Sequence, residues 1–144
     1  MRAPLLLALA SLAISTAQAV EPTRTLTLAC KGIETTKSDE HSTSEKITMG
    51  LVVDFQNKTV IGFTPRSSVP IHISAVDKTT ISFFASDGYW SLSGTIDRAT
   101  GMVLAASERA NPNTGNLVWA LSYLLQCRSM QANAKDVMLG SRGN

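Results

Sequence analysis

Short segments in which apolar and polar residues alternate recur along the chain. From Ile47 to Phe55 every second residue is apolar, and most residues between them are small or polar. In the segment Tyr89–Asp97 the same period places Trp90, Leu92 and Ile96 on one side. A period of two is typical of strands with one buried face and one solvated face. The pattern predicts eight strands, at 25–30, 47–55, 59–63, 69–76, 80–86, 89–97, 102–108 and 117–127.

Sequences typical of turns separate these segments. Asp87-Gly88 predicts a tight hairpin, because glycine accepts a positive φ without steric cost. Asp97-Arg98-Ala99-Thr100-Gly101 predicts a type I turn with its glycine in the left-handed position. Residues 34–45 are polar without a clear period, and we expect a loop there. Short turns between strands favour an antiparallel meander.

The last apolar segment, 117–127, fits two structures. Trp119, Leu121 and Tyr123 share the parity of a strand, whereas Leu117, Leu121 and Leu124 would also line one face of a helix. The neighbouring segments are strands, and aromatic residues suit a pleated surface. We therefore favour a strand.

Cys30 and Cys127 are the only cysteines. In a small exported domain two cysteines usually pair, and the alternatives are free thiols or a metal site. A disulfide requires Cα atoms within about 7 Å, so the first and last strands must lie close together. We predict an all-β fold of about eight antiparallel strands in a small meander barrel closed by this disulfide. A two-sheet β-sandwich is the alternative.

The first 19 residues have the three parts of a secretory signal peptide. Arg2 is basic, residues 5–14 are apolar, and Ala17 and Ala19 are small residues before a predicted cleavage ahead of Val20. The apolar run is shorter than the roughly 20 residues that span a bilayer, so no stable membrane anchor is expected. These features predict a periplasmic or secreted protein with a signal peptide at 1–19, a single β domain at 20–128 and a flexible tail at 129–144.

Charge and motifs narrow the function further. The chain has 13 Lys and Arg against 11 Asp and Glu, scattered and mixed in sign, so nucleic acid is not an expected partner. There is no Gly-x-Ser-x-Gly elbow, and we expect no enzymatic activity and no catalytic or cofactor-binding residues. His41, within the expected loop, and His72, on a solvated parity, are not expected to bind metal.

The predicted hairpin tip Ser86-Asp87-Gly88-Tyr89 is the candidate partner-binding site. Tyr89 and Trp90 are adjacent and must point to opposite faces of a strand. Trp90 shares its parity with core positions, whereas an exposed tyrosine suits a binding surface.

Three features resemble small exported proteobacterial proteins of unknown function: Cys30 in the first strand, the Gly-Thr-Ile-Asp-Arg-Ala-Thr-Gly hairpin at 94–101, and the Tyr-Leu-Leu-Gln-Cys ending at 123–127. The layout is also similar to periplasmic c-type lysozyme inhibitors, which are small barrels stapled between early and late cysteines. In that family a Ser-Gly loop and a tyrosine engage the enzyme's cleft. Ser86 and Gly88 are separated by Asp87 here, so the match to that motif is loose.

Three classes of function remain. The first is a non-enzymatic exported binding module for a small amphipathic molecule or an envelope component such as an envelope protein. The second is an inhibitor of a secreted hydrolase such as lysozyme, and the third is a hydrolase without a recognisable motif. An eight-stranded barrel either is filled by its own side chains or holds one small ligand. Bulky inward positions favour a filled interior, and three small positions expected to face inward leave some room: Ala75, Ala85 and Gly94.

Overall fold

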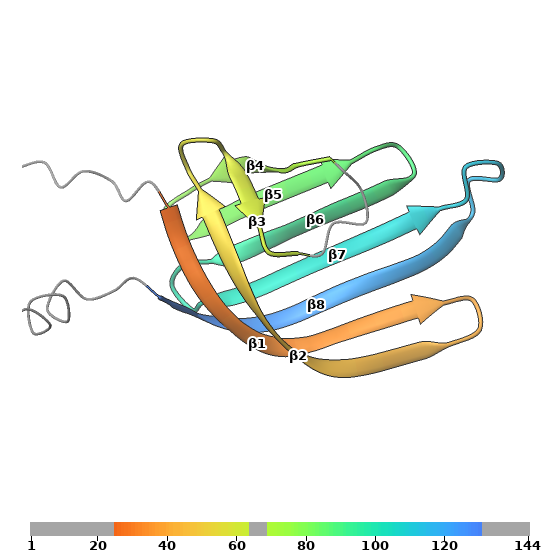
Figure 1. Ribbon diagram of the computed structural model, residues 1–144, viewed down its shortest axis with the longest axis horizontal. Coiled ribbons are helices and arrows are strands. Elements are labelled where there is room, and N and C mark those ends of the chain that lie inside the picture. Colours follow the sequence, from red (N-terminus) through yellow and green to blue (C-terminus); the bar gives the residue numbers. More distant parts are fainter. Residues whose placement is uncertain (1–24, 64–68, 131–144) are drawn as a thin grey trace, which may run out of the picture.

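The computed structural model describes residues 25–63 and 69–130, and these residues form an all-β fold (Figure 1). Eight antiparallel strands follow one another around a closed barrel, in the order of the sequence. The predicted fold class and the strand at 117–127 are both confirmed. The strands are β1 (Thr25–Ser38), β2 (Ser42–Asp54), β3 (Thr59–Ile61), β4 (Ile71–Val76), β5 (Thr80–Ser86), β6 (Trp90–Asp97), β7 (Met102–Ala110) and β8 (Leu117–Ser129).

The first and last strands close the barrel. β1 pairs with β8 over eleven residue pairs from Leu28↔Ser129 to Ser38↔Trp119. Cys30 lies directly opposite Cys127 in this register, and the two form a disulfide. The seam therefore joins residues 97 positions apart. The predicted pairing of the cysteines is confirmed, and so is the closure of the sheet that was inferred from it.

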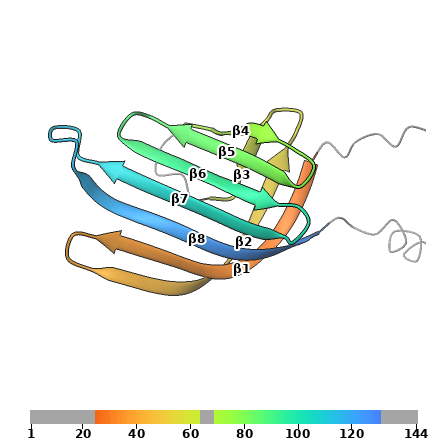
Figure 2. The same ribbon diagram turned by 180° about the vertical axis from the view of Figure 1, so that it is seen from behind.

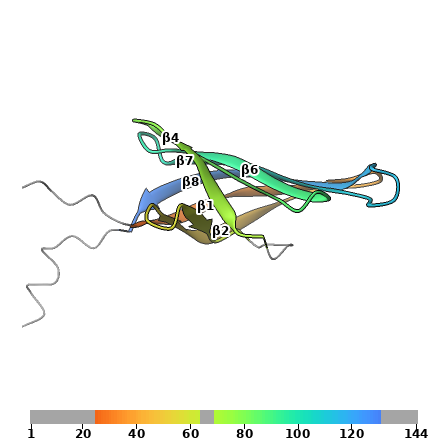
Figure 3. The same cartoon turned by 90° about the horizontal axis from the view of Figure 1, so that it is seen from above.

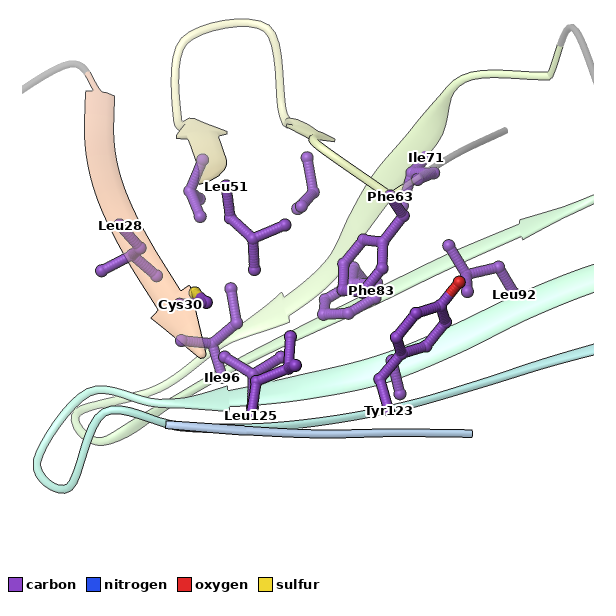
Figure 4. Packing of buried hydrophobic residues seen from close by; sticks show 14 of the residues in the cluster. Leu28, Cys30, Leu51, Phe63, Ile71, Phe83, Leu92, Ile96, Tyr123 and Leu125 are labelled. Atoms are coloured by element: carbon purple, nitrogen blue, oxygen red, sulfur yellow. The ribbon is translucent and has the colours of Figure 1, made fainter. Parts of the chain in front are cut away.

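Apolar side chains from all sides fill the barrel. The aromatic rings of Phe63, Phe83 and Tyr123 pack together, with centroids 5.3 Å apart for Phe63–Phe83 and 5.2 Å apart for Phe63–Tyr123 (Figure 4). Leu51 and Leu125 are completely or almost completely buried in the same cluster. Burial of this apolar surface is the main force that stabilises the fold.

The structure corrects the expectations for residues 34–45 and for Ala75. Residues 34–45 do not form a loop: β1 continues to Ser38 and β2 begins at Ser42, so only a three-residue turn separates the two strands. Ala75 was expected to face inward, but it is exposed and pairs with the outward-facing Ser82. A register shift between Ile73 and Ala75 reverses the parity of the strand at this point.

The β1–β2 hairpin extends well beyond the part of β2 that pairs with β3. β2 pairs with β1 over thirteen residues, but with β3 only over Val52–Asp54. In Figures 1 and 2 the distal part of β2 forms the outer edge of the sheet, with β1 as its only neighbouring strand. We refer to residues 31–48 as the arm.

Four of the turns begin with an aspartate that accepts two backbone hydrogen bonds. The Asp97 carboxylate accepts from the N–H groups of Ala99 and Thr100, and Asp54 and Asp77 do the same in their turns. These bonds hold the pKa of Asp54, Asp77 and Asp97 below its ordinary value, because the donors favour the charged form. Gly101 has a φ of 74°, which confirms the left-handed position predicted for it.

Some predictions fall outside the described residues. These are the signal peptide at 1–19, its cleavage before Val20, and residues 131–144 of the tail predicted at 129–144. Within residues 25–63 and 69–130, no helix is long and apolar enough to cross a membrane.

Candidate functional site

On the outer face of the barrel, side chains of neighbouring strands line up in rows that cross the sheet. Ile33 of β1 lies opposite Leu124 of β8, which lies opposite Leu104 of β7. The row continues through Thr95 of β6 to Ser82 of β5. These strands lie side by side in Figure 2, in the order β1, β8, β7, β6, β5. We refer to Ile33, Leu124 and Leu104 as the aliphatic row; their side chains are 44% to 52% exposed.

A second row of small side chains runs beside the aliphatic row, two residues along each strand. The Thr35 and Ser44 hydroxyl groups are hydrogen-bonded at 2.8 Å across β1 and β2. At the far end the row reaches Phe84 of β5, which is 49% exposed and lies opposite the exposed His72 of β4. We refer to this set as the hydroxyl row, and its members from β2 to β5 are Ser44, Thr35, Ser122, Ala106, Ser93 and Phe84.

A hollow of about 940 Å³ lies along the two rows, and we refer to it as the outer trough. The residues between the rows, among them Phe83, Gly94 and Tyr123, form its floor. Twisted barrels have a hyperboloid shape. The profile of the outer wall is therefore concave along each strand, and the hollow itself runs across the strands. The Phe83 and Tyr123 side chains point into the core (Figure 4), so one layer of backbone separates the trough from the core.

Gly94 keeps this wall thin. A Cβ atom at Gly94 would overlap the Phe83 ring and lie 2.6 Å from the Leu104 carbonyl oxygen. The missing side chain therefore lets the Phe83 ring pack directly against the backbone of β6. The small residue does not leave room inside the barrel, because an aromatic ring from the neighbouring strand occupies it.

The predicted hairpin tip lies beyond the hydroxyl row. Tyr89 is 55% exposed, and Trp90 is buried in the core as expected. The Asp87 carboxylate accepts hydrogen bonds from the Tyr89 and Trp90 N–H groups at 3.0 and 2.7 Å. Gly88 has a φ of 94°, which only glycine adopts readily. The geometry of the turn thus fixes the direction in which Tyr89 projects.

Three of the four tip residues line a second, smaller hollow. Ser86, Gly88 and Tyr89 border a space of about 270 Å³, together with Glu108 of β7 and Leu117 of β8. Asp87 is not among the residues that line this hollow, and its carboxylate holds the turn. The structure therefore brings Ser86, Gly88 and Tyr89 together at one surface.

The two histidines do not come together. His41 lies in the turn at the end of the arm, and His72 is exposed on β4. Among residues 25–63 and 69–130, no three His, Cys, Asp or Glu side chains gather as a set of metal ligands.

Sequence reasoning did not find the outer trough. Its signal was present in strands whose outward positions are apolar as well as their inward ones, such as Leu104 and Leu124. A period-two analysis assigns one face to the core and gives no reason to examine the other. Only the register of β1, β8 and β7 shows that these side chains are adjacent.

Comparison with known proteins returned no match, whether to protein-family models, to curated proteins or to solved structures.

Proposed function

We propose that this protein is a non-enzymatic exported binding module, and that the outer trough holds a small amphipathic molecule. One observation carries the proposal: an exposed aliphatic row lies directly beside a row of hydroxyl groups. Contiguous apolar side chains on the surface of a soluble protein are a common mark of a binding site. The hydroxyl groups of Thr35, Ser122 and Ser93 add donors and acceptors for the polar parts of a ligand.

The shape of the trough favours a long, narrow ligand. The hydroxyl row crosses six strands, which is roughly 24 Å at about 4.8 Å per strand. Binding sites of drug-sized molecules are usually apolar hollows of about 300–1,000 Å³, so the volume also fits. A linear apolar chain could contact Ile33, Leu124 and Leu104 along its length.

Binding of a neutral, environment-sensitive dye tests this proposal. N-phenyl-1-naphthylamine fluoresces strongly in apolar surroundings, so its fluorescence should rise on titration with the protein. Leu124→Glu should weaken dye binding by about tenfold or more, because burial of a leucine side chain contributes about 1.5–3 kcal/mol.

Ile61→Glu is the matched control. Ile61 is 62% exposed and lies on β3, outside the trough lining, so its replacement should leave the affinity unchanged. Equal loss in both variants, or no binding by the unaltered protein, would contradict the proposal.

The hairpin tip supports a second candidate function, inhibition of a secreted hydrolase. The exposed Tyr89 ring stands on a turn held by Asp87, and exposed tyrosines are frequent anchors at protein interfaces. An inhibition assay against a c-type lysozyme tests this alternative. Tyr89→Ala should then reduce inhibition strongly, and an unaltered protein that does not inhibit the enzyme argues against the alternative.

A further inference from the structure

The arm carries three lysines on the same face as the outer trough. Ile33 of the aliphatic row lies opposite Lys46 of β2, which extends that row by one strand. Lys31 and Lys37 share the outward parity of Ile33 on β1. All three lysines are exposed. The β1–β2 end of the trough is therefore bordered by three positive charges.

The acidic residues of the arm strands face the other way. Glu34 and Glu45 lie directly opposite each other, on the inward parity of β1 and β2. Like charges in opposite positions destabilise a pair of strands, so this placement has a cost. The arm thus separates its charges, with lysines on the trough side and glutamates on the inner side.

The lysine charges have few partners on their own face. Among the described residues, none of Lys31, Lys37 and Lys46 forms an ion pair with a carboxylate. Glu108 is the acidic side chain on this face that is nearest to Lys37 in the register, two strands away. Asp39 and Glu40 lie in the turn at the end of the arm, beyond Lys37. Lys31 and Lys46 therefore place positive charge beside Ile33 on the trough face, and this placement favours an anion at that position.

The opposite end of the trough has a different character. There the hydroxyl row reaches the Phe84 ring, which lies opposite the exposed His72 of β4. The neighbouring members of the rows are Ser93, Ser82 and Thr95. The trough is consequently polarised along its length, with positive charge at one end, aliphatic side chains in the middle and an aromatic ring at the other end.

We infer that the ligand of the outer trough is an anionic amphiphile with a single linear apolar chain. Its anionic head, a carboxylate or a phosphate monoester, lies at Lys31 and Lys46, which flank Ile33, and its chain runs along the aliphatic row toward Phe84. This inference rests on the proposed function, because it names the class of ligand that the same trough would hold.

Displacement of the neutral dye by amphiphiles with the same chain and different heads tests the inference. Dodecanoate, dodecyl phosphate and dodecanol are compared below the concentrations at which they aggregate, with inorganic phosphate as a chainless anion. We expect at least one of the two anionic amphiphiles to displace the dye at a concentration at least tenfold below that of dodecanol. The two anionic arms distinguish a carboxylate source from a phosphate source. Added salt should lower the affinity of the protein for the anionic amphiphiles and leave its affinity for dodecanol unchanged.

Charge reversal locates the head group. Lys31→Glu/Lys46→Glu should remove the preference for the anions, measured as the ratio of the displacing concentrations of dodecanol and of the anionic amphiphile in the same variant. Lys58→Glu/Lys78→Glu makes the same change of charge in two turns away from the trough and should keep the preference. All four substituted side chains lie in the described strands and turns, and circular dichroism confirms that each variant is folded.

The outcomes separate the two proposals. If dodecanol binds as tightly as both anions, or if the two double variants behave alike, the inference about the head group is wrong and the proposed binding function stands. If neither dye nor any amphiphile binds, both are wrong. Displacement by inorganic phosphate as effective as that by dodecyl phosphate would show a simple anion site and also overturn the inference.

Discussion

The two halves of the β1–β2 hairpin are built from the same strands but are stabilised in different ways. Near the disulfide, Cys30, Leu51 and Val53 are completely buried, and neighbouring strands surround the core (Figure 3). In the arm most side chains are exposed, and the backbone of β1 pairs with β2 on one side and β8 on the other. One half therefore depends on burial of apolar surface, and the other on backbone pairing.

This difference explains which parts of the fold the sequence predicted. The core half has a clear period of two, from Ile47 to Phe55, and its strand was predicted. The arm has charged residues on both parities, such as Lys37 and Glu34, so no period marks it as a strand. The arm pairs with β8 through backbone hydrogen bonds, and a hydropathy pattern contains no information about such bonds.

The largest expected difference between the two regions is in the cost of truncating a side chain. Phe83→Ala removes a ring that is 2% exposed and packs on Phe63, so the free energy of unfolding should fall by about 3–5 kcal/mol. Ile33→Ala, in the arm, should change it by less than about 1 kcal/mol. Urea denaturation of both variants measures the difference. Similar losses would mean that the arm is as tightly packed as the barrel.

A second test adds a methyl group at one of two strand glycines, Gly94 in β6 or Gly50 in β2, and compares the stability of the two variants. Gly94→Ala should lower stability by about 1–3 kcal/mol, because the new Cβ atom would overlap Phe83 and crowd the Leu104 carbonyl. Gly50→Ala in β2 places its Cβ atom no closer than 3.9 Å to the Leu28 carbonyl oxygen, so it should be neutral or slightly stabilising. Thermal melts compare the two variants. If Gly50→Ala is the more destabilising one, the thin wall under the trough is not tightly packed.

The smallest expected effect is a loss of stability at low pH that comes from the aspartates in the turns. Hydrogen bonds from the backbone lower the pKa of Asp54, Asp77 and Asp97 in the folded protein. The stability that they contribute is therefore present above the unfolded pKa of about 3.9 and is lost as the pH falls through the lower folded values. The thermal midpoint should drop below pH 4, and Asp97→Asn should make that drop shallower. An identical pH profile in Asp97→Asn would contradict this assignment.

The candidate site was harder to predict than the fold, and one residue shows why. Leu124 lies between the inward-facing Tyr123 and Leu125, and it faces outward into the trough. In the sequence this apolar run was ambiguous between a strand and a helix. The ambiguity arose because the Leu124 side chain lies on the outer surface while its two neighbours pack in the core. The hairpin tip was located from its turn chemistry, since Asp87 and Gly88 are local signals. Whether Tyr89 binds a partner stays a prediction.

The seam between β1 and β8 bears on how quickly the chain can reach this structure. Every other pair of neighbouring strands is consecutive in the sequence, so those contacts are local. The seam joins Cys30 to Cys127, and contacts across so many residues form slowly because a long loop must close first. Once the disulfide has formed, that loop stays closed in the unfolded chain. An oxidised molecule that unfolds therefore begins refolding with its most distant contact already made, and a reduced one does not.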